Sequence, residues 1–275
     1  MNNTETDHKL IFTRPIKIFI AIELALYLLF MGMDITFSDI DFSNTNIFYK
    51  IASIRMLSPS MLKYYAILLC FAFSLYRYIK TREKSVGFLT LAMCFTIVSD
   101  YFLLLNPEQI IPGLFTFIIA QSVYLYIING GILQKTVSAL GIRVALAIGI
   151  YQLLKYFDVI YYAYDSEMRL TILLGIMYAV SFLGNIIRHG VLLFLNKKAA
   201  GNESSKPVIK CMFRLPVLFL VGLILFVLCD INVLIYNLHR FISAYYLEYG
   251  TLYSLSAVLM WGFYLPSQVI IVLSA

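Results

Sequence analysis

Charged residues are scarce in this chain: they make up 13% of its 275 residues, whereas 61% are hydrophobic. The mean hydropathy is +0.85. A soluble domain of this length needs far more polar surface, so the composition excludes a water-soluble globular protein and predicts a chain that uses lipid as its solvent. The net charge of +6 is spread along the sequence and is not gathered in a basic, aromatic-interleaved patch, so we expect no nucleic-acid partner.

Cysteine and histidine are also scarce. The four cysteines stand singly, without a CxxC pair, and the three histidines lie far apart in the sequence. These residues cannot together build a zinc site, and the cysteines are better interpreted as small core residues. The motifs of serine hydrolases, metalloproteases and nucleotide-binding proteins are missing as well. We therefore expect neither a metal nor another cofactor.

Eight apolar runs are each long enough to cross a bilayer, whose hydrocarbon core of about 30 Å needs about 20 helical residues. The runs cover residues 16–35, 61–79, 86–105, 110–129, 140–161, 169–195, 213–236 and 252–275. They predict an all-α, polytopic bundle of transmembrane helices that forms a single domain over residues 1–275. The longer outer connection, residues 36–60, is too polar to span, and we expect an interfacial helix in it around Ile47 to Met56.

Lysine and arginine fall mainly on one side of the predicted bundle, the side of the N-terminus. The positive-inside rule makes that side cytoplasmic, so both termini are predicted to be cytoplasmic in a multi-pass protein of the cell membrane. Fifteen of the 21 basic residues are assigned to this side: Lys9, Arg14, Lys17, Arg77, Lys80, Arg82, Lys84, Lys135, Arg143, Arg188, Lys197, Lys198, Lys206, Lys210 and Arg214.

Two aspartates lie inside apolar runs and in similar positions. Asp100 and Asp230 are each about six residues from the outer end of their run, roughly 9 Å below that boundary. A carboxylate at this depth is costly unless it faces a partner or a wet cavity, so both are candidate functional residues. Their runs cross the membrane in the same direction, so the carboxyl groups can lie at one level. A purely structural role, as hydrogen-bond acceptors between helices, stays open.

Other polar residues inside the runs are candidates for lining the same pocket. Gln121 and Tyr124 lie nearly on one face of the fourth run, and Tyr264 and Gln268 form an i, i+4 pair on the last run. Singly, each is better interpreted as a contact between helices than as a functional group; as a set they could line a polar pocket. Lys63, at the outer end of the second run, is either a snorkelling anchor or a contact for a phosphate or carboxylate group.

The segments around the two aspartates resemble the signatures of a known family. The stretch FTIVSDYFLLLNPEQIIPGLFTFIIAQSVYLYI looks like the first signature of the YhhN-like lysoplasmalogenases, and GLILFVLCDINVLIYNLHRF looks like the second. The matching positions are Asp100, Pro107, Gly113, Phe117, Tyr124, Gly222, Phe226, Asp230, Tyr264 and Gln268. The chain departs from the family at Gln121, where histidine is usual, and at Tyr64, where proline commonly follows the lysine.

The resemblance implies hydrolysis of the vinyl-ether bond of a lysophospholipid, with release of a fatty aldehyde. Such a bond is cleaved by protonation of its β-carbon, which gives an oxocarbenium ion that water then captures. Our hypothesis is that one of Asp100 and Asp230 is the acid, while the other stabilises the cation and orients water. Two alternatives remain: a non-enzymatic protein that binds or transports membrane lipids, and a homologue impaired by Gln121, since glutamine cannot carry a proton near neutral pH.

Overall fold

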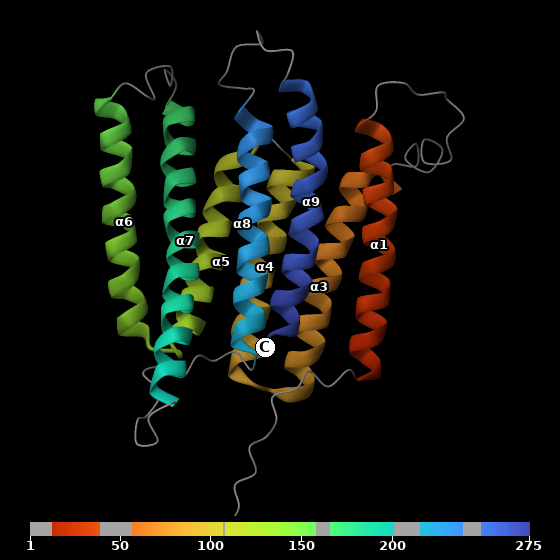
Figure 1. Ribbon diagram of the computed structural model, residues 1–275, viewed down its shortest axis with the longest axis horizontal. Helices are drawn as coiled ribbons and strands as arrows, with labels where there is room; N and C mark the ends of the chain where they lie inside the picture. Colours follow the sequence, from red (N-terminus) through yellow and green to blue (C-terminus); the bar gives the residue numbers. More distant parts are fainter. Residues whose placement is uncertain (1–12, 39–56, 107, 158–165, 201–214, 239–248) are drawn as a thin grey trace, which may run out of the picture.

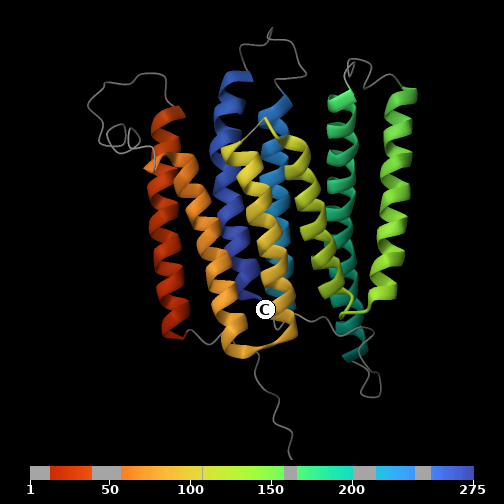
Figure 2. The ribbon, with the colours of Figure 1, turned by 180° about the vertical axis from the view of Figure 1, so that it is seen from behind.

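The computed structural model describes residues 13–38, 57–106, 108–157, 166–200, 215–238 and 249–275, and these form a bundle of long helices (Figures 1 and 2). Within these described ranges, eight helical segments are long and apolar enough to cross a membrane. The predicted all-α, polytopic bundle is thereby confirmed. The elements are α1 (Arg14–Ser38), α3 (Pro59–Thr81), α4 (Lys84–Asp100), the π-helix η2 (Tyr101–Leu105), α5 (Ile110–Ile128), α6 (Leu133–Tyr156), α7 (Ser166–Ala200), α8 (Pro216–Leu238) and α9 (Tyr249–Leu273).

Successive membrane-spanning helices run in alternating directions. Helices α1, α4, α6 and α8 begin at the lower end in Figure 1, where α3, α5, α7 and α9 end. We call this the basic end, because Arg14, Lys84, Lys135 and Lys197 lie there. Helices α1 and α6 lie at opposite edges of the bundle, and α4, α5, α8 and α9 lie between them in both views.

The outer surface of the bundle is apolar. Large aliphatic side chains are exposed on the edge and outer helices, for example Ile142 on α6 at 67% and Ile187 on α7 at 66%. The interior holds aromatic and aliphatic residues together with a set of buried polar side chains. A surface of this kind suits lipid and not water, in agreement with a multi-pass integral membrane protein.

Two helices are longer toward the basic end than the apolar pattern predicts. Helix α6 begins at Leu133, seven residues before the predicted run, because the turn after α5 is closed by Gly130 and Gly131 at φ angles of 68° and 77°. Helix α7 continues to Ala200. Arg143 and Arg188, which the sequence assigned to the cytoplasmic side, therefore lie well inside helices. The predicted interfacial helix around residues 47–56 falls outside the described residues.

Glycine allows close approach within both hairpins that carry an aspartate. A Cβ at Gly222 on α8 would lie 2.6 Å from the Ile271 side chain and 3.2 Å from the carbonyl oxygen of Ser267 on α9. A Cβ at Gly113 on α5 would lie 2.6 Å from the Leu103 side chain. Contacts under 3.0 Å force the neighbouring atoms to shift, so glycine at both positions permits the observed packing without such a shift.

Helix α9 contains Pro266, and a residue on α1 compensates for its missing N–H group. The carbonyl of Gly262, four residues earlier, loses its usual intrahelical donor. The Tyr27 hydroxyl on α1 donates a hydrogen bond of 3.2 Å to this carbonyl oxygen. Such satisfaction by a neighbouring helix is what makes proline acceptable inside a membrane span. It also joins α1 to the part of α9 that carries the predicted site residues.

Candidate functional site

Asp100, the last residue of α4, points into the bundle and is 5% exposed. The Tyr264 hydroxyl on α9 donates to both carboxyl oxygens, at 2.9 Å to Oδ1 and 2.7 Å to Oδ2. Sequence reasoning named both residues as candidates, and the structure brings them together. A π-helical turn, η2, follows Asp100 directly. Single π-helical turns in α-helices occur frequently at functional sites.

The second aspartate has a tyrosine partner of its own. Asp230 on α8 is half-buried, and its Oδ2 accepts a hydrogen bond of 2.8 Å from the Tyr178 hydroxyl on α7. Tyr178 was not predicted as a site residue. It is one of 21 tyrosines and has no distinguishing neighbour in the sequence, so its role becomes visible only when α7 packs against α8.

Aromatic rings connect the two aspartate–tyrosine pairs. The ring of Tyr264 lies 5.3 Å from that of Phe226, Phe226 lies 5.9 Å from Phe117, and Phe117 lies 5.7 Å from Tyr178. Asp100 and Asp230 therefore belong to one region of the bundle interior, which Phe117 and Phe226 fill.

Lys63 is buried and paired, and it is not a snorkelling anchor. It is 8% exposed, and its Nζ lies 2.7 Å from Oδ2 of Asp34 on α1. The Nζ also lies 5.1 Å from the centre of the Trp261 ring. Trp261 in turn packs on Tyr264, with 5.0 Å between ring centroids. The ion pair is thus joined by contacts to the partner of Asp100. Asp34 was not predicted as a site residue, because it lies at the very end of an apolar run.

Gln121, Tyr124 and Gln268 are buried in the same bundle, but their described hydrogen bonds go to other groups than the two aspartates. Gln121 accepts from Asn185, the Tyr124 hydroxyl lies 3.9 Å from the sulfur of Met93, and Gln268 donates to the neighbouring Ser267 at 3.4 Å. Gln121 and Gln268 are thus separated in their hydrogen bonding from the two aspartate–tyrosine pairs, and sequence spacing alone did not reveal this separation.

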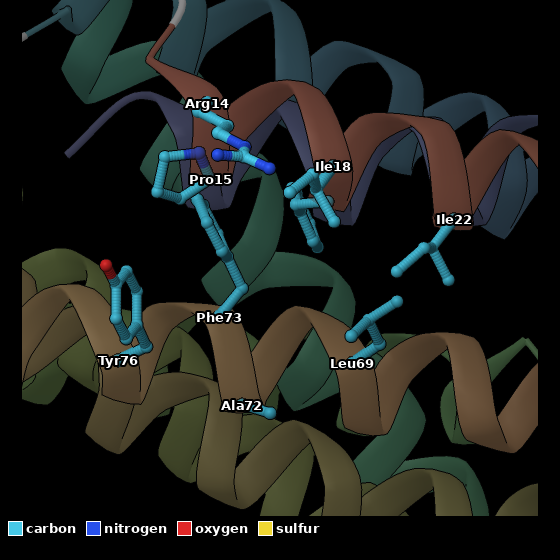
Figure 3. Close-up of a pocket in the computed structure, with 9 residues that line it drawn as sticks. Arg14, Pro15, Ile18, Ile22, Leu69, Ala72, Phe73 and Tyr76 are labelled. Carbon is cyan, nitrogen blue, oxygen red and sulfur yellow. The ribbon is translucent and has the colours of Figure 1, made fainter.

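A groove of about 430 Å³ opens at the basic end between α1 and α3 (Figure 3). Arg14, Ile18 and Ile22 face Leu69 and Phe73 across it. None of the predicted site residues lines this groove. A group of three His, Cys, Asp or Glu side chains able to hold a metal ion is not found among the described residues.

No protein-family model matches this chain, and no curated protein or solved structure matches it either. The resemblance to the YhhN-like family therefore rests on the sequence segments quoted above. Several residues of those segments form defined contacts: Asp100 bonds to Tyr264, Gly113 and Gly222 allow close helix approach, and Phe117 packs on Phe226.

Two carboxyl groups with phenolic partners can carry out acid–base chemistry at fixed positions. A tyrosine hydroxyl orients the carboxyl group to which it donates, so each aspartate has a defined direction. The surrounding rings exclude water, and that strengthens electrostatic interactions in the site. The arrangement suits a reaction in which a proton is delivered to an apolar substrate and a positive charge develops nearby.

Proposed function

We propose that this protein is a membrane-embedded hydrolase of the lysoplasmalogenase type, which cleaves the vinyl-ether bond of a lysophospholipid. The main support is the pair of aspartates on α4 and α8, each held by a tyrosine from a neighbouring helix. The sequence resemblance points to the same reaction. In this proposal Asp100 and Asp230 are the catalytic residues, and Tyr264 and Tyr178 are positioning residues.

The proposed reaction begins with proton transfer from one aspartic acid to the β-carbon of the vinyl ether. The carbon that remains bonded to the ether oxygen becomes an oxocarbenium ion, and the other aspartate, ionised, stabilises it. Water adds to this carbon and gives up a proton, which restores the acid. The hemiacetal then breaks its bond to the glycerol oxygen, so that a fatty aldehyde and a glycerophospho-headgroup leave. The proton balance is zero over the cycle.

Substrate placement follows from the lining of the region. The alkenyl chain would enter among the aromatic rings, so Phe117 and Phe226 must separate to admit it. The headgroup would lie toward the end where α1 ends and α3 begins, near the ion pair of Lys63 and Asp34. Lys63 can then contact the phosphate and Asp34 an amine, while the face of Trp261 adds a cation–π contact.

The test is aldehyde release from a purified lysoplasmalogen by the purified protein and by Asp100→Asn and Asp230→Asn. Loss of an acid–base group typically lowers a rate by about 10²- to 10⁴-fold. We expect losses of this size from both variants, which keep the shape of the side chain. Thermal unfolding checks that the variants remain folded. Unchanged release from both variants would refute the mechanism.

Mass spectrometry of the same incubations separates the alternatives. Retention of intact lipid without cleavage identifies a lipid-binding or transport protein, and neither retention nor cleavage identifies an impaired homologue. One observation concerns the alternative of an impaired homologue. The Gln121 side chain, at the position where the family usually has histidine, is hydrogen-bonded to Asn185 and not to either aspartate.

A further inference from the structure

A buried arginine lies in the middle of an edge helix. Arg143 is ten residues after the start of α6, about 15 Å along that helix, and it is 7% exposed. Its guanidinium packs on α7 at Gly184, where a Cβ would lie 2.8 Å from the Arg143 Nε. An ionisable residue inside a membrane span is costly and calls for a partner. Within the described part of the chain, no Asp or Glu forms an ion pair with it.

Arg143 fixes the orientation of two neighbouring amides. Its Nη1 donates 2.8 Å to Oδ1 of Asn185 on α7, so the amide nitrogen of Asn185 must face the other way. That nitrogen donates 2.9 Å to Oε1 of Gln121 on α5. Oε1 of Gln121 is therefore the bonded atom, and Nε2 is left as a buried donor without a hydrogen-bond partner. Exchanging the Gln121 oxygen and nitrogen would set two amide donors against each other.

A second arginine adds positive charge to this cluster. Arg188, one turn beyond Gly184 on α7, donates from Nε to Oδ1 of Asn129 at a distance of 2.5 Å. Asn129 caps α5 at the basic end, about 12 Å along the helix from Gln121. The Arg143 guanidinium packs against Gly184, one turn from Arg188 on the same face of α7, so the two positive charges lie near each other. Positive charge thus extends from the basic end of α5 inward toward the Gln121 amide.

We infer that Arg143, Arg188 and Gln121 form a binding site for an oxyanion of the phosphate type, entered from the basic end of the bundle. Among the described side chains, the two guanidinium groups have no acidic partner. The buried amide nitrogen of Gln121 has no acceptor for its hydrogen bonds. An anion between them would accept from Nε2 of Gln121 and neutralise the repulsion between the arginines. The site lies between α5, α6 and α7, so it is separate from the aspartates and does not depend on the proposed hydrolase activity.

Phosphate fits this set of donors better than a spherical anion does. Guanidinium groups present several N–H donors in a planar fork that matches the oxygens of phosphate, and charge-assisted bonds of this kind are the strong ones. The phosphate can belong to a lipid headgroup of the adjacent leaflet or to a free ion, and the chemistry of the contacts is the same for both. Membrane composition and added salt distinguish the two sources.

The test is thermal unfolding of the full chain, purified in a neutral detergent at constant ionic strength. Sodium phosphate is compared with sodium chloride. In a second arm, the protein is placed in nanodiscs of phosphatidylcholine alone or of phosphatidylcholine with phosphatidic acid. A ligand that binds only the folded state raises the melting temperature, here by about 3 °C or more at saturation. A rise with phosphate in detergent identifies a free anion, and a rise only with phosphatidic acid identifies a lipid headgroup.

Substitutions of the proposed contact residues test whether the rise in melting temperature arises at this site. Arg143→Gln, Arg188→Gln and Gln121→Leu each remove one of the proposed contacts and should lower or abolish the rise. Lys135→Gln is the matched control, because it removes one positive charge from an exposed position on the same helix and should leave the rise unchanged. Arg188 is half-buried, so its variant keeps the test valid if Arg143→Gln does not fold.

Three outcomes would overturn the assignment. One is the lack of any rise in the unsubstituted protein with either phosphate or phosphatidic acid. Another is an equal rise with chloride, which would mean general charge screening. The last is a full rise retained in Arg188→Gln and Gln121→Leu together, which would place the anion elsewhere.

Discussion

The two aspartates occupy similar positions in the sequence, but their surroundings differ. Asp100 is almost fully buried, and both of its carboxyl oxygens accept from the Tyr264 hydroxyl. Asp230 is half-buried, and only Oδ2 accepts from Tyr178. In a low-dielectric interior a polar group without a partner is costly, so Asp100 depends on its tyrosine more than Asp230 does. Similar sequence contexts have therefore produced one tightly enclosed carboxyl group and one more open one.

Removing each tyrosine hydroxyl tests this difference most directly, and it should give the largest effect on stability. Tyr264→Phe leaves the buried carboxyl group of Asp100 without its donor, and we expect it to lower the free energy of unfolding by about 2 to 3 kcal/mol. Tyr178→Phe should cost about 1 kcal/mol or less, because Asp230 is less enclosed and only one of its oxygens accepts from the tyrosine. Unfolding of both variants in mixed detergent measures the two values.

Aldehyde release should fall in both tyrosine variants if each hydroxyl positions its aspartate. The matched control is Tyr156→Phe at the end of α6, where an 80% exposed tyrosine loses its hydroxyl. Equal destabilisation by Tyr264→Phe and Tyr178→Phe would contradict the proposed difference between the two carboxyl groups.

Part of this site was predictable from sequence. Asp100 and Asp230 stand out because an ionisable group inside an apolar run is costly, and Tyr264 stands out through its i, i+4 spacing with Gln268. Tyr178 and Asp34 do not stand out, since tyrosine is common throughout the chain and Asp34 lies at the end of its run. Their roles depend on which helices become neighbours, and apolar periodicity does not encode this. The same limit explains why the position of Arg143 was misjudged. The sequence placed Arg143 near the cytoplasmic boundary, because the apolar run does not show that α6 begins earlier, directly after the turn at Gly130 and Gly131.

The architecture was predictable to a greater extent than the site. Eight runs of suitable length are nearly sufficient to fix an all-α bundle, because a lipid-exposed backbone must satisfy its own hydrogen bonds. The arrangement of the helices was not predictable in the same way. Close packing of α8 on α9 depends on the absence of a side chain at Gly222, which only coordinates reveal.

Replacing Gly113 in the α4–α5 hairpin and Gly222 in the α8–α9 hairpin by alanine extends the comparison of the two regions. The expected loss of stability is intermediate in size. The Cβ of Gly222→Ala would meet backbone atoms of α9, which cannot move away easily, so we expect a loss of about 1 to 2 kcal/mol in unfolding free energy. Gly113→Ala meets mainly the Leu103 side chain, which can rotate, so its cost should be smaller.

Gly175→Ala on α7 is the control for both glycine variants. A Cβ there has no neighbour within 4 Å, and alanine favours the helix over glycine by about 1 kcal/mol, so this change should be neutral or stabilising. Thermal unfolding of the three variants ranks them. A larger loss from Gly113→Ala than from Gly222→Ala would show that the α4–α5 hairpin is the more rigid of the two.

The helices that deliver the two tyrosines also differ, and this gives the smallest expected effect. Helix α9, which carries Tyr264, contains Pro266, whereas α7, which carries Tyr178, has no proline. Tyr27 compensates for the proline by donating to the Gly262 carbonyl.

Tyr27→Phe should therefore cost about 1 kcal/mol in the unsubstituted protein, the usual net value of one hydrogen bond. In a Pro266→Ala background the alanine N–H can donate to the same carbonyl, so the same change should cost less. A double-mutant cycle measures this coupling, which we expect to be about 0.5 to 1 kcal/mol. Strict additivity would mean that the hydroxyl of Tyr27 does not replace the bond lost at Pro266.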